Sequence, residues 1–295
     1  MIIPVILGPT CTGKTSLALK IAKEKKANIL SIDSRQVFIK LDIGTGKFKE
    51  KAEIKKFKGY WEIDGVKIYG YDFLEINEEL NVIKFCEFAK KVIEDSIFSN
   101  QKLLITCGTG FYLDFLMGNI SYNEINPERK TYLNSLNLEQ LQKIFFSFEN
   151  RPAVDEKNKV RLITAILTLE NPNSKKHNFK IDNVEFRVFK IEESREVIFK
   201  NADAFVESIL NGGVVEEYKR LYAEYGMQKH LNGLIYSDIH KFLTGATIDQ
   251  KTLEERIKFS LHAYIRRQET YFKKIKFDTS TKDRNLITEK ISNLF

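Results

Sequence analysis

The sequence predicts an α/β fold: a parallel sheet flanked by helices, with a small helical insertion and a helical C-terminal region. In the first hundred residues, short apolar runs alternate with helical patterns, which is typical of strands joined by crossover helices. After Gly118 the chain becomes polar and then mostly helical. The 295 residues are 43% hydrophobic and 12% aromatic, which supplies enough apolar area for a core and excludes a mostly unfolded chain.

The elements of the N-terminal region follow from hydrophobic periodicity. The run Ile2–Leu7 predicts a buried strand, and residues 15–26 predict a helix that leads to a second strand at Asn28–Ile32. Residues 81–96 place apolar side chains on one helical face, and residues 102–106 predict a third strand. We assign these elements to the first part of an α/β core, at residues 1–118.

The rest of the chain predicts an insertion followed by a return to the core. Residues 119–157 are rich in Asn, Glu and Lys, with a helical stretch at 138–148, and form the expected insertion. Residues 158–295 return to the core. In that part we expect a helix at 158–169, a strand at 184–191 and helices over the remainder, at 193–210, Val214–Tyr225 and 252–274.

Charge and cysteine content set broad limits. The net charge of +7 suits an anionic partner such as phosphate or nucleic acid, and it equally suits an ordinary basic surface. Cys11, Cys86 and Cys107 have no paired spacing, which disfavours a disulfide framework or a zinc site and favours a reducing compartment. No apolar run is long enough to span a membrane, and the first strand does not resemble a signal peptide. We therefore expect a soluble, cytoplasmic protein with no membrane partner.

A phosphate-binding loop (P-loop) follows the first strand. Residues 8–15 fit G-x-x-x-x-G-K-[ST] between a buried strand and a helix, and they are Gly8, Pro9, Thr10, Cys11, Thr12, Gly13, Lys14 and Thr15. The loop N–H groups and the helix N-terminus favour an anion. Lys14 can reach a terminal phosphate, and the Thr15 hydroxyl can ligate Mg²⁺. The motif predicts phosphate binding without naming the ligand.

The ends of the neighbouring strands narrow the chemistry. The third strand is followed by Cys107-Gly108-Thr109 without an acid, which disfavours a motor or switch NTPase. The second strand is followed by Asp33. Ligands of open parallel sheets bind beyond the carboxyl ends of the strands, so Asp33, Thr109 and the P-loop are expected to converge on one crevice. Asp33 is a candidate general base there, and the alternative is a helix N-cap.

Several motifs resemble those of tRNA dimethylallyltransferases in order and spacing. In the first half of the chain they are the P-loop, Asp33-Ser34-Arg35-Gln36-Val37-Phe38, Leu41-Asp42-Ile43-Gly44-Thr45-Gly46-Lys47 and Gly108-Thr109-Gly110-Phe111-Tyr112-Leu113. Further similar segments are the helix around Arg161 and Ala165, Gly213-Val214-Val215-Glu216-Glu217, and Arg266-Arg267-Gln268-Glu269-Thr270-Tyr271-Phe272. The resemblance spans nearly the whole chain.

The resemblance implies transfer of a dimethylallyl group from dimethylallyl diphosphate to N6 of the adenosine adjacent to the tRNA anticodon. The P-loop would then hold a leaving diphosphate rather than ATP, with Lys14 and Thr109 on its oxygens and a Mg²⁺ cofactor at Thr15. Asp33 would take the proton of the attacking amino group. The implied partners are tRNA and the diphosphate donor, and we expect a monomer.

The resemblance also implies residues that bind RNA. Ser34, Arg35 and Gln36, together with Asp33, would contact a base that is turned out of the RNA loop and the phosphate beside it. On the inserted helical subdomain, further RNA contacts would come from Arg129, Lys130 and Arg161. Exposed basic side chains such as those at 129 and 130 are also an ordinary surface feature.

Several family positions carry other residues in this chain. Thr164 replaces the second Arg of the paired-Arg helix, Ser237 replaces a Lys, and Leu261-His262 replaces a Thr-Arg pair. Most of these changes remove basic side chains that contact RNA or diphosphate in the family. Three alternatives therefore stay open: a small-molecule P-loop kinase that uses ATP, an enzyme that prenylates free adenine nucleotides, and a non-catalytic RNA-binding relative.

Overall fold

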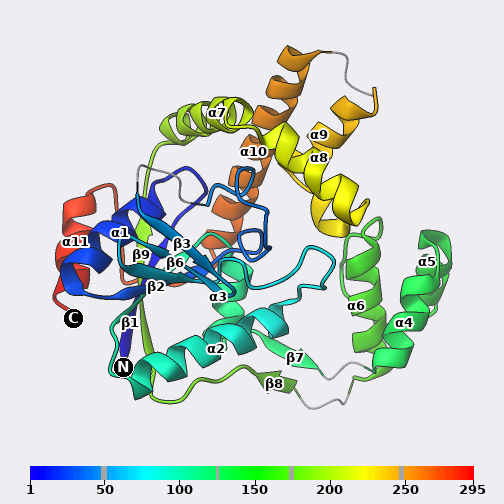
Figure 1. Cartoon of the computed structure of the whole chain (residues 1–295). Helices are drawn as coiled ribbons and strands as arrows, with labels where there is room; N and C mark the ends of the chain where they lie inside the picture. Colours follow the sequence, from blue (N-terminus) through cyan, green and yellow to red (C-terminus); the bar gives the residue numbers. More distant parts are fainter. Residues whose placement is uncertain (48–51, 124–125, 173–175, 246–248) are drawn as a thin grey trace. The chain divides into compact units, whose positions relative to one another are not determined.

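The chain folds into two compact units. The computed structural model describes residues 1–47, 52–123, 126–172, 176–245 and 249–295. The first unit, the core, comprises Met1–Met117 and Ile181–Phe295, and the second unit is Gly118–Lys180 (Figure 1). In the described part of the chain, no helix has both the length and the apolar character needed to cross a membrane.

An eight-stranded sheet forms the centre of the core, in the order β10-β9-β1-β6-β2-β5-β4-β3. β1 (Ile2–Leu7) lies between β6 (Leu103–Cys107) and β9 (Glu185–Ile191), and β2 (Asn28–Ile32) lies on the other side of β6. These strands are all parallel. The predicted α/β fold and its predicted strands are confirmed, and the carboxyl ends of β1, β2 and β6 meet at one edge of the sheet.

Three short strands extend this sheet where the sequence analysis predicted none. The strands are β3 (Ile54–Phe57), β4 (Tyr60–Ile63) and β5 (Val66–Tyr69). β4 pairs antiparallel with both β3 and β5, and β5 pairs parallel with β2. Each strand has only four residues, and only alternate side chains of β4 and β5 are buried. Such short half-buried strands give a weak hydrophobic signal.

Helices pack around the sheet. α1 (Lys14–Lys25) and α11 (Arg284–Ser292) share a hydrophobic cluster with the sheet and lie side by side in Figure 1. The other helices of the core are α2 (Val82–Phe98), α3 (Gly110–Leu116), α7 (Arg195–Asn211), α8 (Val214–Tyr225), α9 (Ile235–Leu243), α10 (Gln250–Phe272) and the 3₁₀ helix η1 (Lys229–Leu231). The expectation that the chain is helical throughout after the strand at 184–191 was wrong at β10 (Thr279–Thr281). This three-residue strand pairs with β9.

The second unit has its own apolar cluster. It contains α4 (Pro127–Ser135), α5 (Leu138–Phe146) and α6 (Lys159–Glu170), whose buried side chains include Leu133, Leu141, Phe145 and Leu162. β7 (Ser121–Asn123) pairs with β8 (Lys176–Asn178) and joins the two ends of the unit. The unit therefore extends to Lys180 instead of ending at 157 as expected, because α6 packs on α4 and α5. Residues 124–125 of the expected insertion lie outside the described residues.

Candidate active site

The P-loop connects β1 to α1 and is held by hydrogen bonds of its own. Gly13, directly before α1, has a φ of 76°, a left-handed conformation that favours glycine. Lys14 Nζ and Thr12 Oγ1 both donate to the carbonyl oxygen of Pro9, at 2.6 and 2.8 Å. The first turn of α1 contains no acidic residue. The positive end of this helix is therefore left for an anion.

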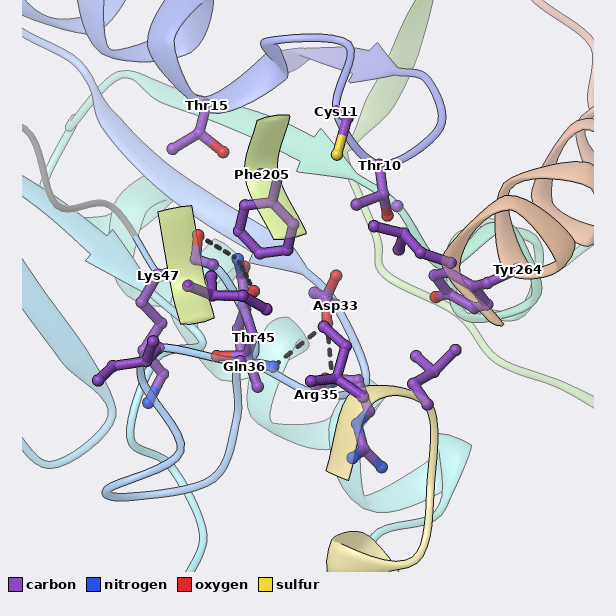
Figure 2. A pocket seen from close by; sticks show the side chains of 18 of the residues that line it. Thr10, Cys11, Thr15, Asp33, Arg35, Gln36, Thr45, Lys47, Phe205 and Tyr264 are labelled. Carbon is purple, nitrogen blue, oxygen red and sulfur yellow. Dashed lines mark hydrogen bonds between the residues drawn. The ribbon is translucent and has the colours of Figure 1, made fainter. Parts of the chain in front are cut away.

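A cavity of about 570 Å³ opens beside the P-loop (Figure 2). Its lining includes the predicted residues Thr10, Cys11, Gly13, Lys14, Thr15, Asp33, Arg35 and Gln36. The predicted residues outside the lining are Gly8, Pro9, Thr12, Ser34 and Thr109. Apolar side chains complete the wall, among them Phe205, Ile209 and Leu261. The cavity therefore joins a phosphate site to a carboxylate and to an apolar surface.

Asp33 both caps the turn after β2 and faces the cavity. Its Oδ1 accepts hydrogen bonds from the backbone N–H groups of Arg35 and Gln36, at 2.7 and 3.2 Å (Figure 2). Within the described residues its Oδ2 has no hydrogen-bond partner, and it lies 3.3 Å from the position that a Cβ on Gly108 would take. The cap and general-base interpretations are thus compatible, since each oxygen can serve one of them.

Thr109 links the turn after β6 to the turn after β2. Its Oγ1 accepts a hydrogen bond from the backbone N–H of Ser34 at 3.2 Å. The N–H groups of Gly108 and Thr109 in turn donate to the carbonyl of Ile32. Asp33 and the P-loop thus line one cavity as expected, whereas Thr109 is not among the lining residues and supports the turn through Ser34. Its implied contact with the diphosphate stays a prediction.

Gln268 joins this turn to the P-loop. Its Oε1 accepts from the Thr10 N–H at 3.0 Å, and its Nε2 donates to the Gly108 carbonyl at 2.8 Å. Gln268 is 6% exposed and follows Leu261 and Ile265 on the buried face of α10. A polar residue on an apolar helical face is the sequence signal for such a role, but its partners are more than 150 residues away. The bond to Gln268 also means that the Thr10 N–H is not free for phosphate.

Arg35 and Gln36 use their polar ends within the protein. One Arg35 nitrogen donates to the carbonyls of His230 and Gly233, at 2.6 and 3.5 Å, and burial lowers the pKa of this guanidinium. Gln36 Oε1 accepts from the Ser31 hydroxyl, and its Nε2 donates to carbonyls of the loop after β2. Both residues line the cavity. Their contact with RNA stays a prediction.

Glu217 on α8 holds the loop at residues 42–46, which forms one wall of the cavity. Its carboxylate accepts backbone hydrogen bonds from Asp42, Ile43 and Gly44, at 2.9, 2.7 and 3.1 Å. It also accepts from the Tyr236 hydroxyl at 2.7 Å and is only 3% exposed. Burial, followed by the charge of Glu217, raises the pKa of Tyr236 well above its ordinary value. Glu217 belongs to one of the motifs that resemble the family, but the motif does not reveal this contact with the loop.

Lys47 closes the same loop from the other end. Its side chain is fully buried, and its ammonium donates to the Phe38 carbonyl at 2.7 Å and forms ion pairs with Asp42 and Asp72. Asp72 also accepts from the Trp61 indole N–H at 2.7 Å. A buried ammonium with this many partners fixes the loop in place.

Burial shifts the pKa values of Lys14 and Cys11 in the P-loop and of Cys107 at the end of β6. It raises the pKa of the Cys11 thiol to about 11 and that of Cys107 to about 12, so both thiols are neutral at pH 7. Burial lowers the pKa of Lys14, an effect that the charge of Asp33 opposes. The cysteines are thus unsuited to nucleophilic chemistry.

The positions that depart from the family pattern have partners of their own. His262 stacks on Phe199, with ring centres 4.0 Å apart, and its Nε2 lies 2.8 Å from an Asp203 oxygen. Leu261 adds an apolar side chain to the cavity wall. The Ser237 hydroxyl donates to the Leu234 carbonyl. None of these three supplies a positive charge that is free to meet a diphosphate.

The predicted RNA-contacting residues of the second unit differ in their surroundings. Arg129 forms a bidentate ion pair with Glu170, through Nε and a second guanidinium nitrogen. Lys130 and Arg161 are exposed, and their side chains have no charged partner among the described residues. Thr164 is exposed and donates to the carbonyl of Val160. Lys130 and Arg161 are therefore better placed than Arg129 to meet an external phosphate.

The predicted Mg²⁺ fits the donors that the cavity offers. The described residues hold no group of three or more His, Cys, Asp or Glu side chains that could bind a metal by themselves. The Thr15 side chain, at the start of α1, lines the cavity. Mg²⁺ commonly takes one or two protein oxygens and completes its shell with substrate phosphates and water. A magnesium ion that arrives with a diphosphate is compatible with this arrangement.

The fold and the cavity together define an α/β protein with a phosphate-binding loop and a general-base candidate in one cavity. The sequence matches the family model described as IPP transferase over residues 36–275, and the model described as isopentenyl transferase over residues 1–66. This chain belongs to the IPP transferase family.

Individual relatives agree with this assignment. A tRNA dimethylallyltransferase of Clostridioides difficile (strain 630) is 30% identical, over 93% of this chain and 90% of the relative. One of Lachnoclostridium phytofermentans is 31% identical, over 92% and 88%. The crystal structure of a tRNA delta(2)-isopentenylpyrophosphate transferase from Staphylococcus epidermidis shares the fold, with a TM-score of 0.70 and 24% identity over 99% of this chain and 98% of that one.

Proposed function

We propose that this protein transfers a dimethylallyl group from dimethylallyl diphosphate to N6 of the adenosine adjacent to the anticodon of a tRNA. The observation that carries this proposal is the placement of Asp33 and the P-loop on one cavity. An acceptor amine and a diphosphate leaving group must be held within reach of each other, and this cavity offers a group suited to each. Family membership favours prenyl transfer over the reaction of a small-molecule kinase.

Asp33 acts on the acceptor. An adenine amino group is a weak nucleophile because its lone pair is delocalised into the ring. As N6 forms a bond to C1 of the dimethylallyl group, it loses a proton, and the cavity-facing Asp33 oxygen accepts that proton. The turn that holds Asp33 is fixed by its hydrogen bonds to Arg35 and Gln36 and by Thr109, so the carboxylate is oriented before substrate binds.

The P-loop acts on the donor. When the bond between C1 and the bridging oxygen breaks, the electron pair and the negative charge go to the diphosphate. The N–H groups at the start of α1 and the Lys14 side chain, which lines the cavity, would stabilise that charge. Thr15 would hold Mg²⁺, which supplies further charge neutralisation when bound. The apolar wall with Phe205, Ile209 and Leu261 suits the hydrocarbon part of the donor.

The test is incubation of the protein with Mg²⁺, dimethylallyl diphosphate and unmodified tRNA, followed by mass spectrometry of the nucleosides. The expected product is an adenosine heavier by one dimethylallyl group, formed with wild type and not with Asp33→Asn. A parallel reaction with free adenine nucleotides as acceptors tests the nucleotide-prenylating alternative. A second, with ATP as the donor, tests the kinase alternative. A product from free nucleotides alone, or no prenylated nucleoside from any acceptor, would contradict the proposal.

Gln268→Leu is expected to lower kcat by about 10–100-fold. The change removes both hydrogen bonds that join the P-loop to the turn with Thr109, and small displacements between reacting groups have effects of this size. Steady-state kinetics with tRNA measure it. Gln250→Leu is the control, because Gln250 is an exposed glutamine at the start of the same helix. Equal kcat values for the two variants would remove Gln268 from the active-site architecture.

Arg161→Ala is expected to weaken tRNA binding and to reduce its salt dependence. Arg161 is exposed on α6 without a charged partner in the described part of the chain, so it can neutralise about one phosphate. Fluorescence titrations at several salt concentrations measure the slope. Arg129→Ala provides the comparison, because Arg129 is already paired with Glu170 and should change the slope less. An unaltered slope for Arg161→Ala would exclude it from the RNA-binding surface.

A further inference from the structure

Arg284 lies against the P-loop, although it comes from the last helix of the chain. One of its terminal guanidinium nitrogens is 2.8 Å from the position that a Cβ on Gly13 would take, and its central carbon is 3.8 Å from that position. Gly13 is the residue directly before α1 and lines the cavity. Any larger residue at position 13 would therefore displace this guanidinium as well as strain the backbone.

The topology of the sheet brings Arg284 to this position. β10 pairs parallel to β9, which in turn pairs parallel to β1, so all three strands end at the same edge of the sheet. α11 begins directly after β10, and Asp283 caps it by accepting from the N–H groups of Asn285 and Leu286. Arg284 is the first residue of α11, and α11 packs beside α1 (Figure 1).

The Arg284 guanidinium stands beside the positive end of α1. The start of α1 carries the partial positive charge of a helix N-terminus, and the Lys14 side chain lies next to it. A guanidinium beside this helix end is repelled unless an anion lies between the groups. Among the described residues, no side chain forms an ion pair or a hydrogen bond with the Arg284 guanidinium. This arrangement is unfavourable for an empty loop and favourable for a loop that holds a polyphosphate.

We propose that Arg284 is a further ligand of the diphosphate in this protein, contributed by the C-terminal helix. The inference rests on the proposed function, since it concerns the same P-loop. It also accounts for a departure from the family: His262 replaces an Arg and is already paired with Asp203 and stacked on Phe199. Arg284 lies outside the segments that match the family models, at residues 36–275 and 1–66.

The experiment is calorimetric titration of the protein with inorganic pyrophosphate and Mg²⁺, in the absence of tRNA. Arg284→Ala is expected to weaken pyrophosphate binding about tenfold, the size of one charge-assisted hydrogen bond that is partly exposed. Arg284→Lys should recover part of this loss, because it restores the charge without the planar fork. Lys282→Ala is the control, since Lys282 is exposed in the same turn and has the same charge.

The outcomes separate this inference from the proposed function. Failure of wild type to bind pyrophosphate would contradict the proposed donor site itself. Wild-type binding that is unchanged in Arg284→Ala would overturn the role of Arg284 and leave the proposed function intact. Equal weakening in Arg284→Ala and Lys282→Ala would also overturn it, because the effect would then come from general surface charge. Thermal melts of all variants identify any loss that comes from unfolding.

Discussion

Asp33→Asn is expected to lower turnover by about 10²–10⁴-fold while substrate binding stays unchanged, the usual range for a lost general base. Asparagine has the same shape, and its side-chain oxygen can still accept from the N–H groups of Arg35 and Gln36, so the turn after β2 keeps its cap. The oxygen that faces the cavity is replaced by an amide NH2 group, which cannot accept a proton. Single-turnover measurements with saturating donor and tRNA isolate the chemical step.

Asp33→Ala is the companion variant for this prediction. It removes the cap as well as the base, so the free energy of unfolding should fall by about 1 kcal/mol relative to Asp33→Asn, with no greater loss of turnover. Pyrophosphate and tRNA affinities of Asp33→Asn should match wild type. If Asp33→Asn turned over at the wild-type rate, Asp33 would be a capping residue only, and another group would have to accept the proton.

Glu217→Ala is expected to lower the free energy of unfolding by about 3–5 kcal/mol, as when one partner is removed from a buried charged network. The change leaves three backbone N–H groups of the loop at 42–46 and the Tyr236 hydroxyl without their acceptor. The loop forms part of the cavity wall, so activity should fall at temperatures where the protein is still folded. Chemical denaturation followed by circular dichroism measures the stability.

Glu216→Ala is the matched control for Glu217→Ala. Glu216 is the neighbouring residue on α8, it is well exposed, and its one ion pair, with Lys219, is a surface contact. Its removal should change the free energy of unfolding by less than about 0.5 kcal/mol. Similar values for the two variants would mean that Glu217 does not hold the loop, despite its four hydrogen bonds.

The sequence predicts the parts of this fold that have strong periodicity. The apolar strands β1, β2, β6 and β9 and the longer core helices lie within two residues of their expected bounds. The meander β3–β5 was missed because its strands are short and polar on one face. The bounds expected for the second unit were too short, because the sequence does not reveal that α6 packs on α4 and α5.

The candidate site, like the fold, could be predicted only in part. The P-loop and Asp33 could be identified because their chemistry is encoded locally, at a strand end and in a fixed motif. The roles of Gln268 and Glu217 could not, since each depends on partners brought together only by folding: Thr10 for Gln268 and the loop at 42–46 for Glu217. Likewise, the pairing of Arg129 with Glu170 is a tertiary contact that turns an expected free cation into a neutralised one.

The position of β1 in the sheet also sets an order of assembly during synthesis. β1 is made well before β9, which is one of its two neighbours, with Ile3 opposite Phe186. A nascent chain that has not reached β9 therefore exposes an unpaired apolar strand edge, which is a hazard for aggregation. The second unit has its own apolar cluster and is complete before β9 emerges. A ribosome that stalls between these two points would present a finished insertion on an open core, the species that chaperones would be required to protect.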